Sequence, residues 1–198
     1  MALCIEIGFQ NVPESTSFII LTDTLAKILT TIVSRCQIIR FSPLDEISVK
    51  KLIDTASLGI SEEVLLLKLG RGSVNNTTKI LAEVDLVAIV EMLKDVLESL
   101  HKKNKVKLMQ LSNEIASNFD VNMFLSSMEV VNELAMRGNK DLESIIGKTS
   151  NFFKGMDYET IIRACKVIIN GKKDLEKYIS KQITIETIFI ELMEVYND

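Results

Sequence analysis

The sequence predicts a mostly α-helical protein that begins with a short α/β segment. Apolar residues recur at spacings of three and four from residue 44 to the end of the 198-residue chain, as on the buried faces of helices. Helix breakers are scarce, with two prolines and eight glycines. Two short β-branched runs, within residues 17–22 and 37–41, come before this helical region.

The α/β segment covers residues 1–43. The apolar run at residues 17–22 is typical of a strand buried on both faces of a sheet. Asp23 is placed to cap a helix over residues 25–33, which carries one apolar stripe. Residues 37–41 predict a second strand, which the following proline stops. Together they predict one βαβ unit, which needs further strands to make a stable sheet and therefore resembles the end of a larger α/β domain.

Three short helices are expected in residues 44–84. The first reaches Leu58, and Ser61 is placed to cap the second, over residues 62–69. Gly70 to Ser73 then break the chain before the third helix.

Residues 85–198 predict a bundle of five or six helices, which Asp85 opens as a cap. No repeat of 30 to 45 residues with fixed anchor positions is visible, so a solenoid has no support.

Composition excludes several functions. His101 is the only histidine, so a zinc site with two histidines on a helix is excluded. The glycines never spell a P-loop, which makes independent nucleotide hydrolysis unexpected. A net charge of −4 argues against nucleic acid as the main partner. Three scattered cysteines predict reduced thiols in the cytoplasm, and no apolar run is long enough to cross a membrane.

The tripeptide Ser34-Arg35-Cys36 is the main candidate for chemistry. It lies between the predicted helix and the second predicted strand, where a rigid helix end can present an arginine outward. A guanidinium suits phosphate because it is always charged and donates two parallel hydrogen bonds. An arginine offered to the nucleotide of a neighbouring subunit is an arginine finger, and the alternative is a solvated loop arginine.

This context resembles the AAA+ core of clamp-loader subunits. The similarity runs from Pro13 through the Ser34-Arg35-Cys36 motif, which is the trans-acting finger of that family, to the segment Phe41-Ser42-Pro43-Leu44. It implies that residues 1–43 are the C-terminal remnant of an AAA+ core and that residues 44–84 are the three-helix lid. Residues 85–198 resemble the helical collar, the oligomerisation domain, by length and helicity only.

Members that bind ATP carry a sensing arginine where this chain has Asn75. Retention of the finger motif without that arginine resembles the delta-prime class of bacterial DNA polymerase III clamp-loader subunits, which do not hydrolyse ATP. The resemblance implies contacts through residues 85–198 with gamma/tau-like ATPase subunits and the delta subunit. It places ATP only on a neighbour, with weak or indirect DNA contact and no cofactor of its own. Two departures are the absence of the first half of the core and the sequence of residues 7–12, where the family has a Leu-Glu-Glu-Pro-Pro helix.

Two other interpretations stay open: a helical interaction scaffold unrelated to ATP, and a fragment of a gamma/tau-like ATPase subunit. An independent enzyme ranks below both, because no base, nucleophile and metal set can be assembled. Thr22 and Cys36 are expected to be structural, and His101 to be solvated at a helix end. The basic run of Lys102, Lys103, Lys105 and Lys107 is expected to be a solvated break between helices, with a weak DNA or partner contact as the alternative.

Overall fold

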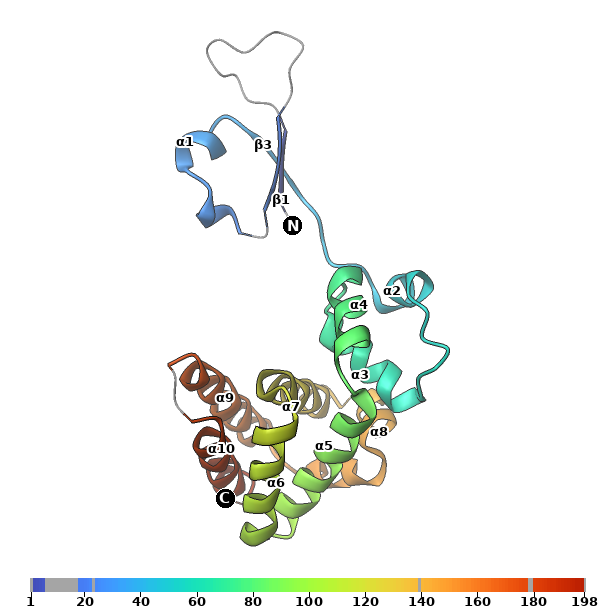
Figure 1. The fold of residues 1–198 in the computed structure, drawn as a ribbon, viewed down its shortest axis with the longest axis vertical. Helices are drawn as coiled ribbons and strands as arrows, with labels where there is room; N and C mark the ends of the chain where they lie inside the picture. Colours follow the sequence, from blue (N-terminus) through green and yellow to red (C-terminus); the bar gives the residue numbers. More distant parts are fainter. Residues whose placement is uncertain (1, 6–17, 23, 139, 178–179, 198) are drawn as a thin grey trace. The chain divides into compact units, whose positions relative to one another are not determined.

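A computed structural model describes residues 2–5, 18–22, 24–138, 140–177 and 180–197. The chain divides after Leu44 into two compact units, which are described one at a time. It is mostly helical, as the sequence predicts (Figure 1). Asp23, the expected cap, and residues 13–17 of the clamp-loader resemblance lie outside the described residues.

The first unit contains a three-stranded sheet in the order β2-β1-β3. The central strand β1 (Ala2–Ile5) pairs antiparallel with both β2 (Ile19–Thr22) and β3 (Gln37–Arg40). The two predicted strands are therefore present and run in the same direction. They are not neighbours as a simple βαβ unit requires, because β1, which the sequence analysis did not predict, takes the backbone hydrogen bonds between them.

The helix predicted between these strands is interrupted. Residues Leu25–Lys27 form a 3₁₀ turn, η1, and Thr30–Val33 form a single α-helical turn, α1. Ile28 between them is extended, with φ −102° and ψ 138°. The β-branched residues of this segment have low helix propensity, and an amphipathic stripe stabilises a helix only where it is buried.

The expectation that the first predicted strand is buried on both faces is wrong for this chain. Ile19 and Leu21 are 62% and 63% exposed. None of the described residues from 18 to 44 is buried. Strands β2 and β3 therefore place no buried side chain on either face of the sheet, and both strands are held by backbone hydrogen bonds to β1.

The second unit begins with three helices, in the region where the sequence predicts three. They are α2 (Glu46–Leu52), α3 (Ile60–Gly70) and α4 (Val74–Glu83). Helix α2 ends earlier than expected, because Ile53 is extended. Ser61 is not the cap of α3, since Gly59 holds that position. The Ser61 hydroxyl instead donates a 2.8 Å hydrogen bond to the carbonyl of Ser144 in the bundle.

Six α-helices follow within the described residues, in agreement with the predicted five or six. Asp85 caps the first by accepting a 3.0 Å hydrogen bond from the Ala88 amide, as expected. The helices are α5 (Leu86–His101), α6 (Lys105–Asn118), α7 (Val121–Met136), α8 (Asp141–Ile146), α9 (Tyr158–Leu175) and α10 (Lys181–Val195), with a 3₁₀ segment, η2 (Gly147–Phe153), between α8 and α9.

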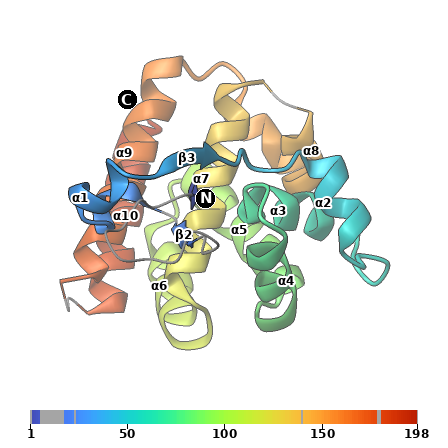
Figure 2. The same ribbon diagram turned by 90° about the horizontal axis from the view of Figure 1, so that it is seen from above.

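One apolar core runs through the whole second unit. Leu65 and Leu66 of α3 belong to the same buried cluster as Leu93 of α5 and Phe124 of α7. Helices α3 and α4 lie beside each other and α3 packs on α5, α7 and α8 (Figure 2). Residues 45–198 therefore form one compact unit, in which α3 and α4 share the core of the bundle.

Candidate functional site

The tripeptide Ser34-Arg35-Cys36 forms the turn that joins α1 to β3. Its three backbone amides donate to carbonyls of the preceding helical turn, at 2.9, 3.0 and 3.2 Å in chain order. The Ser34 hydroxyl adds a 3.2 Å bond to the carbonyl of Thr31. Every backbone N–H of the tripeptide is thus fixed locally, so the turn has a defined conformation.

Arg35 presents its side chain to solvent from this turn. The residue is exposed, and within the part of the chain that the structure describes its guanidinium has neither an ion pair nor a side-chain hydrogen bond. Its five N–H donors are therefore available to an external anion. A phosphate group matches the planar spacing of these donors better than a simple ion does.

Thr22 performs a local role. Its hydroxyl donates to the Thr24 carbonyl at 3.0 Å and accepts from the Thr24 amide at 3.1 Å. Both hydrogen bonds tighten the end of β2, which agrees with the structural role expected from the sequence.

Asn75 lies in the first turn of α4 and is exposed. Ser73 caps this helix through its hydroxyl, which accepts from the Asn76 amide at 3.3 Å. Position 75 therefore offers an amide and no charge at a helix N-terminus. Arg35 belongs to the first unit, whereas Asn75 belongs to the second.

Two basic side chains that precede α4, Lys68 and Arg71, form ion pairs with carboxylates. Lys68 of α3 bonds Glu46 of α2 and Asp141 of α8, each at 2.7 Å. Burial disfavours its charge, but the hydrogen bonds to Asp141 and Glu46 outweigh this effect and raise the Lys68 pKa. The sequence analysis did not identify this network, since its members come from three separate helices. The spacing of charges within a single helix carries no signal for such contacts.

Arg71 extends the network toward the bundle. It stands in the left-handed region at φ 48°, directly before Gly72, and its guanidinium lies 4.0 Å from Glu129 of α7. Lys172 of α9 approaches the same carboxylate oxygen at 2.8 Å. A cavity of about 280 Å³ beside Arg71 and Lys68 is lined by both acids and bases. The mixed lining makes it a poor anion site, and we assign the network a role in joining α2 and α3 to the bundle.

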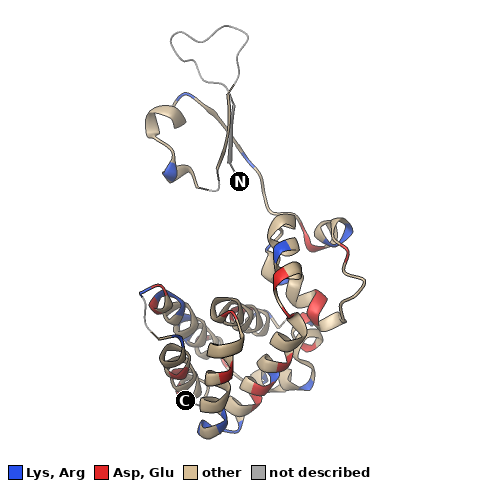
Figure 3. Ribbon diagram, in the orientation of Figure 1, with Lys and Arg blue, Asp and Glu red and all other residues tan. Residues whose placement is uncertain are grey.

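The other candidates have structural surroundings. His101 is the last residue of α5, and its ring lies edge-on to Phe152 at a centroid distance of 5.6 Å. The lysines at positions 102, 103, 105 and 107 are exposed where α5 gives way to α6, and Lys102 pairs with Glu98. Figure 3 shows basic and acidic residues interspersed along the helices of this unit.

The structure describes the side chains of two cysteines, Cys36 and Cys165. Cys36 is half-buried in the candidate turn, and Cys165 is half-buried on α9. Burial, with the nearby carboxylates of Glu133 and Glu129, raises the pKa of Cys165 to about 11, so this thiol stays protonated near neutral pH.

Two further searches cover only the positions that the structure describes. No group of three or more His, Cys, Asp or Glu side chains among them is arranged to hold a metal ion. No helix among them has the length and apolarity needed to cross a bilayer.

Comparison with known proteins adds no relative. No family model, no curated protein and no solved structure matches this chain.

Proposed function

We propose that this chain is a delta-prime-like subunit of a DNA polymerase III clamp loader, which hydrolyses no ATP itself and lends Arg35 to ATP bound on a neighbouring subunit. The observation that carries the proposal is the fixed turn at residues 34–36, which exposes an arginine with no ion pair to any described residue, in a sequence without a P-loop. This chain has an arginine that can donate hydrogen bonds to phosphate but no P-loop to bind a nucleotide of its own. It is therefore suited to act on a nucleotide bound by another protein.

The proposed chemistry is electrostatic. As the γ-phosphoryl group is transferred to water, negative charge on its oxygens and on the leaving β-phosphate is stabilised by the guanidinium of Arg35. The three backbone hydrogen bonds of the turn hold the base of this side chain, which lowers the cost of positioning it. Cys36 takes no part in the transfer.

Assembly is assigned to the helical region. Residues 85–198 supply the long helices through which the chain would join gamma/tau-like ATPase subunits and the delta subunit. A net charge of −4 favours these protein partners over direct DNA binding. The chain then has no independent enzymatic activity and contributes to DNA replication as part of the polymerase holoenzyme in the cytoplasm.

The test is reconstitution of the clamp loader with its ATPase and delta subunits and with the protein that carries this chain. Arg35→Ala should lower DNA-stimulated ATPase and clamp loading at least about tenfold, against the ~10³-fold or more that arginine fingers reach. Arg35→Lys should remain impaired, because an ammonium lacks the bidentate geometry. Arg40→Ala removes another arginine, from β3, and should retain full activity.

An Arg35→Ala protein that assembles normally and loads clamps at the wild-type rate would exclude the finger. The second candidate is a helical scaffold unrelated to ATP, and it is favoured by the concentration of the buried core in residues 45–198. Co-purification separates the two, since a scaffold of that kind should not retain clamp-loader ATPase subunits.

A further inference from the structure

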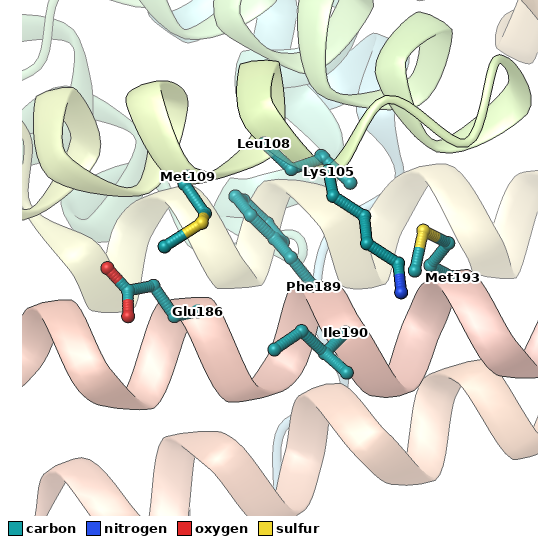
Figure 4. A pocket seen from close by; sticks show the side chains of 7 residues that line it. All are labelled: Lys105, Leu108, Met109, Glu186, Phe189, Ile190 and Met193. Carbon is teal, nitrogen blue, oxygen red and sulfur yellow. The ribbon is translucent and has the colours of Figure 1, made fainter.

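Helices α6 and α10 enclose a shallow apolar pocket on the surface of the second unit. Its volume is about 140 Å³. Figure 4 shows Met109 and Lys105 reaching over it from α6, with Phe189 at its centre and Ile190 beside it from α10. Leu108, Glu186 and Met193 complete the lining.

The surface around this pocket is unusually apolar for one facing solvent. Met109 and Ile190, which line it, are 55% and 52% exposed. Val106, one turn before Met109, is 69% exposed, and Ile183, two turns before Ile190, is 58% exposed. Exposed apolar side chains thus occur on both helices beside the pocket, a feature typical of protein interaction sites. We call these four residues and the pocket the α6–α10 face.

Opposite charges stand at the two ends of the face. Lys105 reaches one end, beside Met193, and Glu186 stands at the other end, as Figure 4 shows. The Ser112 hydroxyl lies 3.4 Å from the Glu186 carboxylate, so the two helices run antiparallel across the pocket. Lys105, at the start of α6, and Glu186 of α10 therefore lie at opposite ends of the pocket.

Both charges lack an opposite partner. Glu186 accepts hydrogen bonds from neutral donors, Gln182 at 3.0 Å and Ser112. Across the described ranges of the chain, neither Glu186 nor Lys105 forms an ion pair. A partner with a negative charge over Lys105 and a positive charge over Glu186 would satisfy both.

We propose that this partner is a second copy of the same chain, bound through the α6–α10 face in a two-fold symmetric dimer. The two-fold axis would lie in the plane of the contact and cross the line from Lys105 to Glu186 at a right angle. It places Lys105 of each copy over Glu186 of the other, which forms two equivalent ion pairs. It also brings the exposed apolar side chains of the two copies together, with Met109 and Met193 able to adapt to the contact. Met109, Ile190 and the two charges form a self-complementary set, with an apolar centre and polar ends.

This inference does not depend on the proposed function. It uses no residue of the Arg35 turn and no nucleotide. An experiment that excludes the dimer would leave the arginine-finger proposal intact, and one that excludes the finger would leave the dimer proposal intact.

The test is sedimentation velocity of the full chain from low to several hundred micromolar. The wild type should show a reversible monomer–dimer equilibrium. Lys105→Glu and Glu186→Lys should each weaken the dimer about tenfold or more, because each places like charges at both ends.

Mixing these two single variants should form a heterodimer with an ion pair at each end. At one end, the glutamate introduced in the first variant meets the lysine introduced in the second. At the other end, the unchanged Lys105 and Glu186 pair as in the wild type. A chain that carries both substitutions should restore self-association, because the two charges are then simply exchanged.

Ile190→Lys should abolish the dimer without affecting the fold, because the side chain is half exposed. Ile169→Lys, at a 40% exposed position on α9, is the matched control and should dimerise normally. A wild type that stays monomeric at the highest concentration would refute the proposal. A dimer that tolerates both charge reversals would refute it as well.

Discussion

Helix α10 approaches α9 closely at Gly171, and replacing this glycine with alanine tests the packing of the bundle. A Cβ atom at this position would lie 2.2 Å from Cδ1 and 2.6 Å from Cγ1 of Ile188. Ile188 is 2% exposed, and together with Gly171 it lines a cavity of about 320 Å³ between α9 and α10. Ordinary van der Waals contact begins near 3.4 Å, so either the Ile188 side chain or one of the two helices must shift.

Two opposing effects decide the free energy of unfolding. Alanine is favoured over glycine in a helix interior by about 1 kcal/mol. Overpacking costs about 1–3 kcal/mol, and two contacts shorter than 3.0 Å make the cost larger than the gain in helix propensity. We therefore expect Gly171→Ala to lower the free energy of unfolding by about 1–2 kcal/mol.

A double-mutant cycle with Ile188→Ala makes the reasoning refutable. Ile188→Ala alone should cost about 2–5 kcal/mol, because it leaves a cavity facing Gly171. In that background Gly171→Ala meets no clash, enters the cavity and gains the helix propensity, so its effect should change sign to stabilising by about 1 kcal/mol. Urea unfolding followed by far-ultraviolet circular dichroism measures all four proteins. A Gly171→Ala protein that is neutral or more stable in the wild-type background would refute the close approach.

Three further predictions concern polar groups. Tyr196→Phe removes the buried 2.6 Å hydrogen bond to the Asn132 side chain and should cost about 1–3 kcal/mol in urea unfolding, whereas an unchanged midpoint would exclude this bond. Hydrogen bonds from Lys50 and Thr55 lower the Glu63 pKa from 4.5. The contribution of Glu63 to stability is therefore present above pH 4.5 and is lost as the pH falls through the folded pKa. In Glu63→Gln, the free energy of unfolding should depend less on pH in this range. With the other cysteines replaced by serine, alkylation of Cys165 should be slow at pH 8 and rise about tenfold per pH unit up to its pKa of about 11; a rate that levels off below pH 9 would contradict its burial.

Short-range signals predicted most of the helical region. The apolar spacing and Asp85 predicted the start of α5, and the break at Gly70 to Ser73 separates α3 from α4 as expected. Each of these features depends on residues within one or two helical turns. The Arg35 turn was also expected between a helix and a strand, and it lies there.

Burial and partner choice were not predictable in this way. A run such as residues 17–22 indicates an apolar strand, but only neighbouring elements determine whether its faces are covered, and Leu21 is exposed. The segment expected to form a helix over residues 25–33 has a regular apolar stripe, yet none of its residues is buried and the helix is interrupted. Ser61 has the chemistry of a helix cap, but its hydroxyl bonds a carbonyl 83 positions away.

Local patterns in the chain were enough to specify the helical class, the positions of most helices and the placement of Arg35 in a connecting turn, because these depend on periodicity and on residues close in the chain. Long-range contacts established the rest: β1 lies between the two predicted strands, Lys68 joins three helices, and α6 and α10 leave an apolar face with unpaired charges. These features arise where distant segments meet, and the free energy of such contacts depends on shape, burial and charge that a linear pattern does not contain.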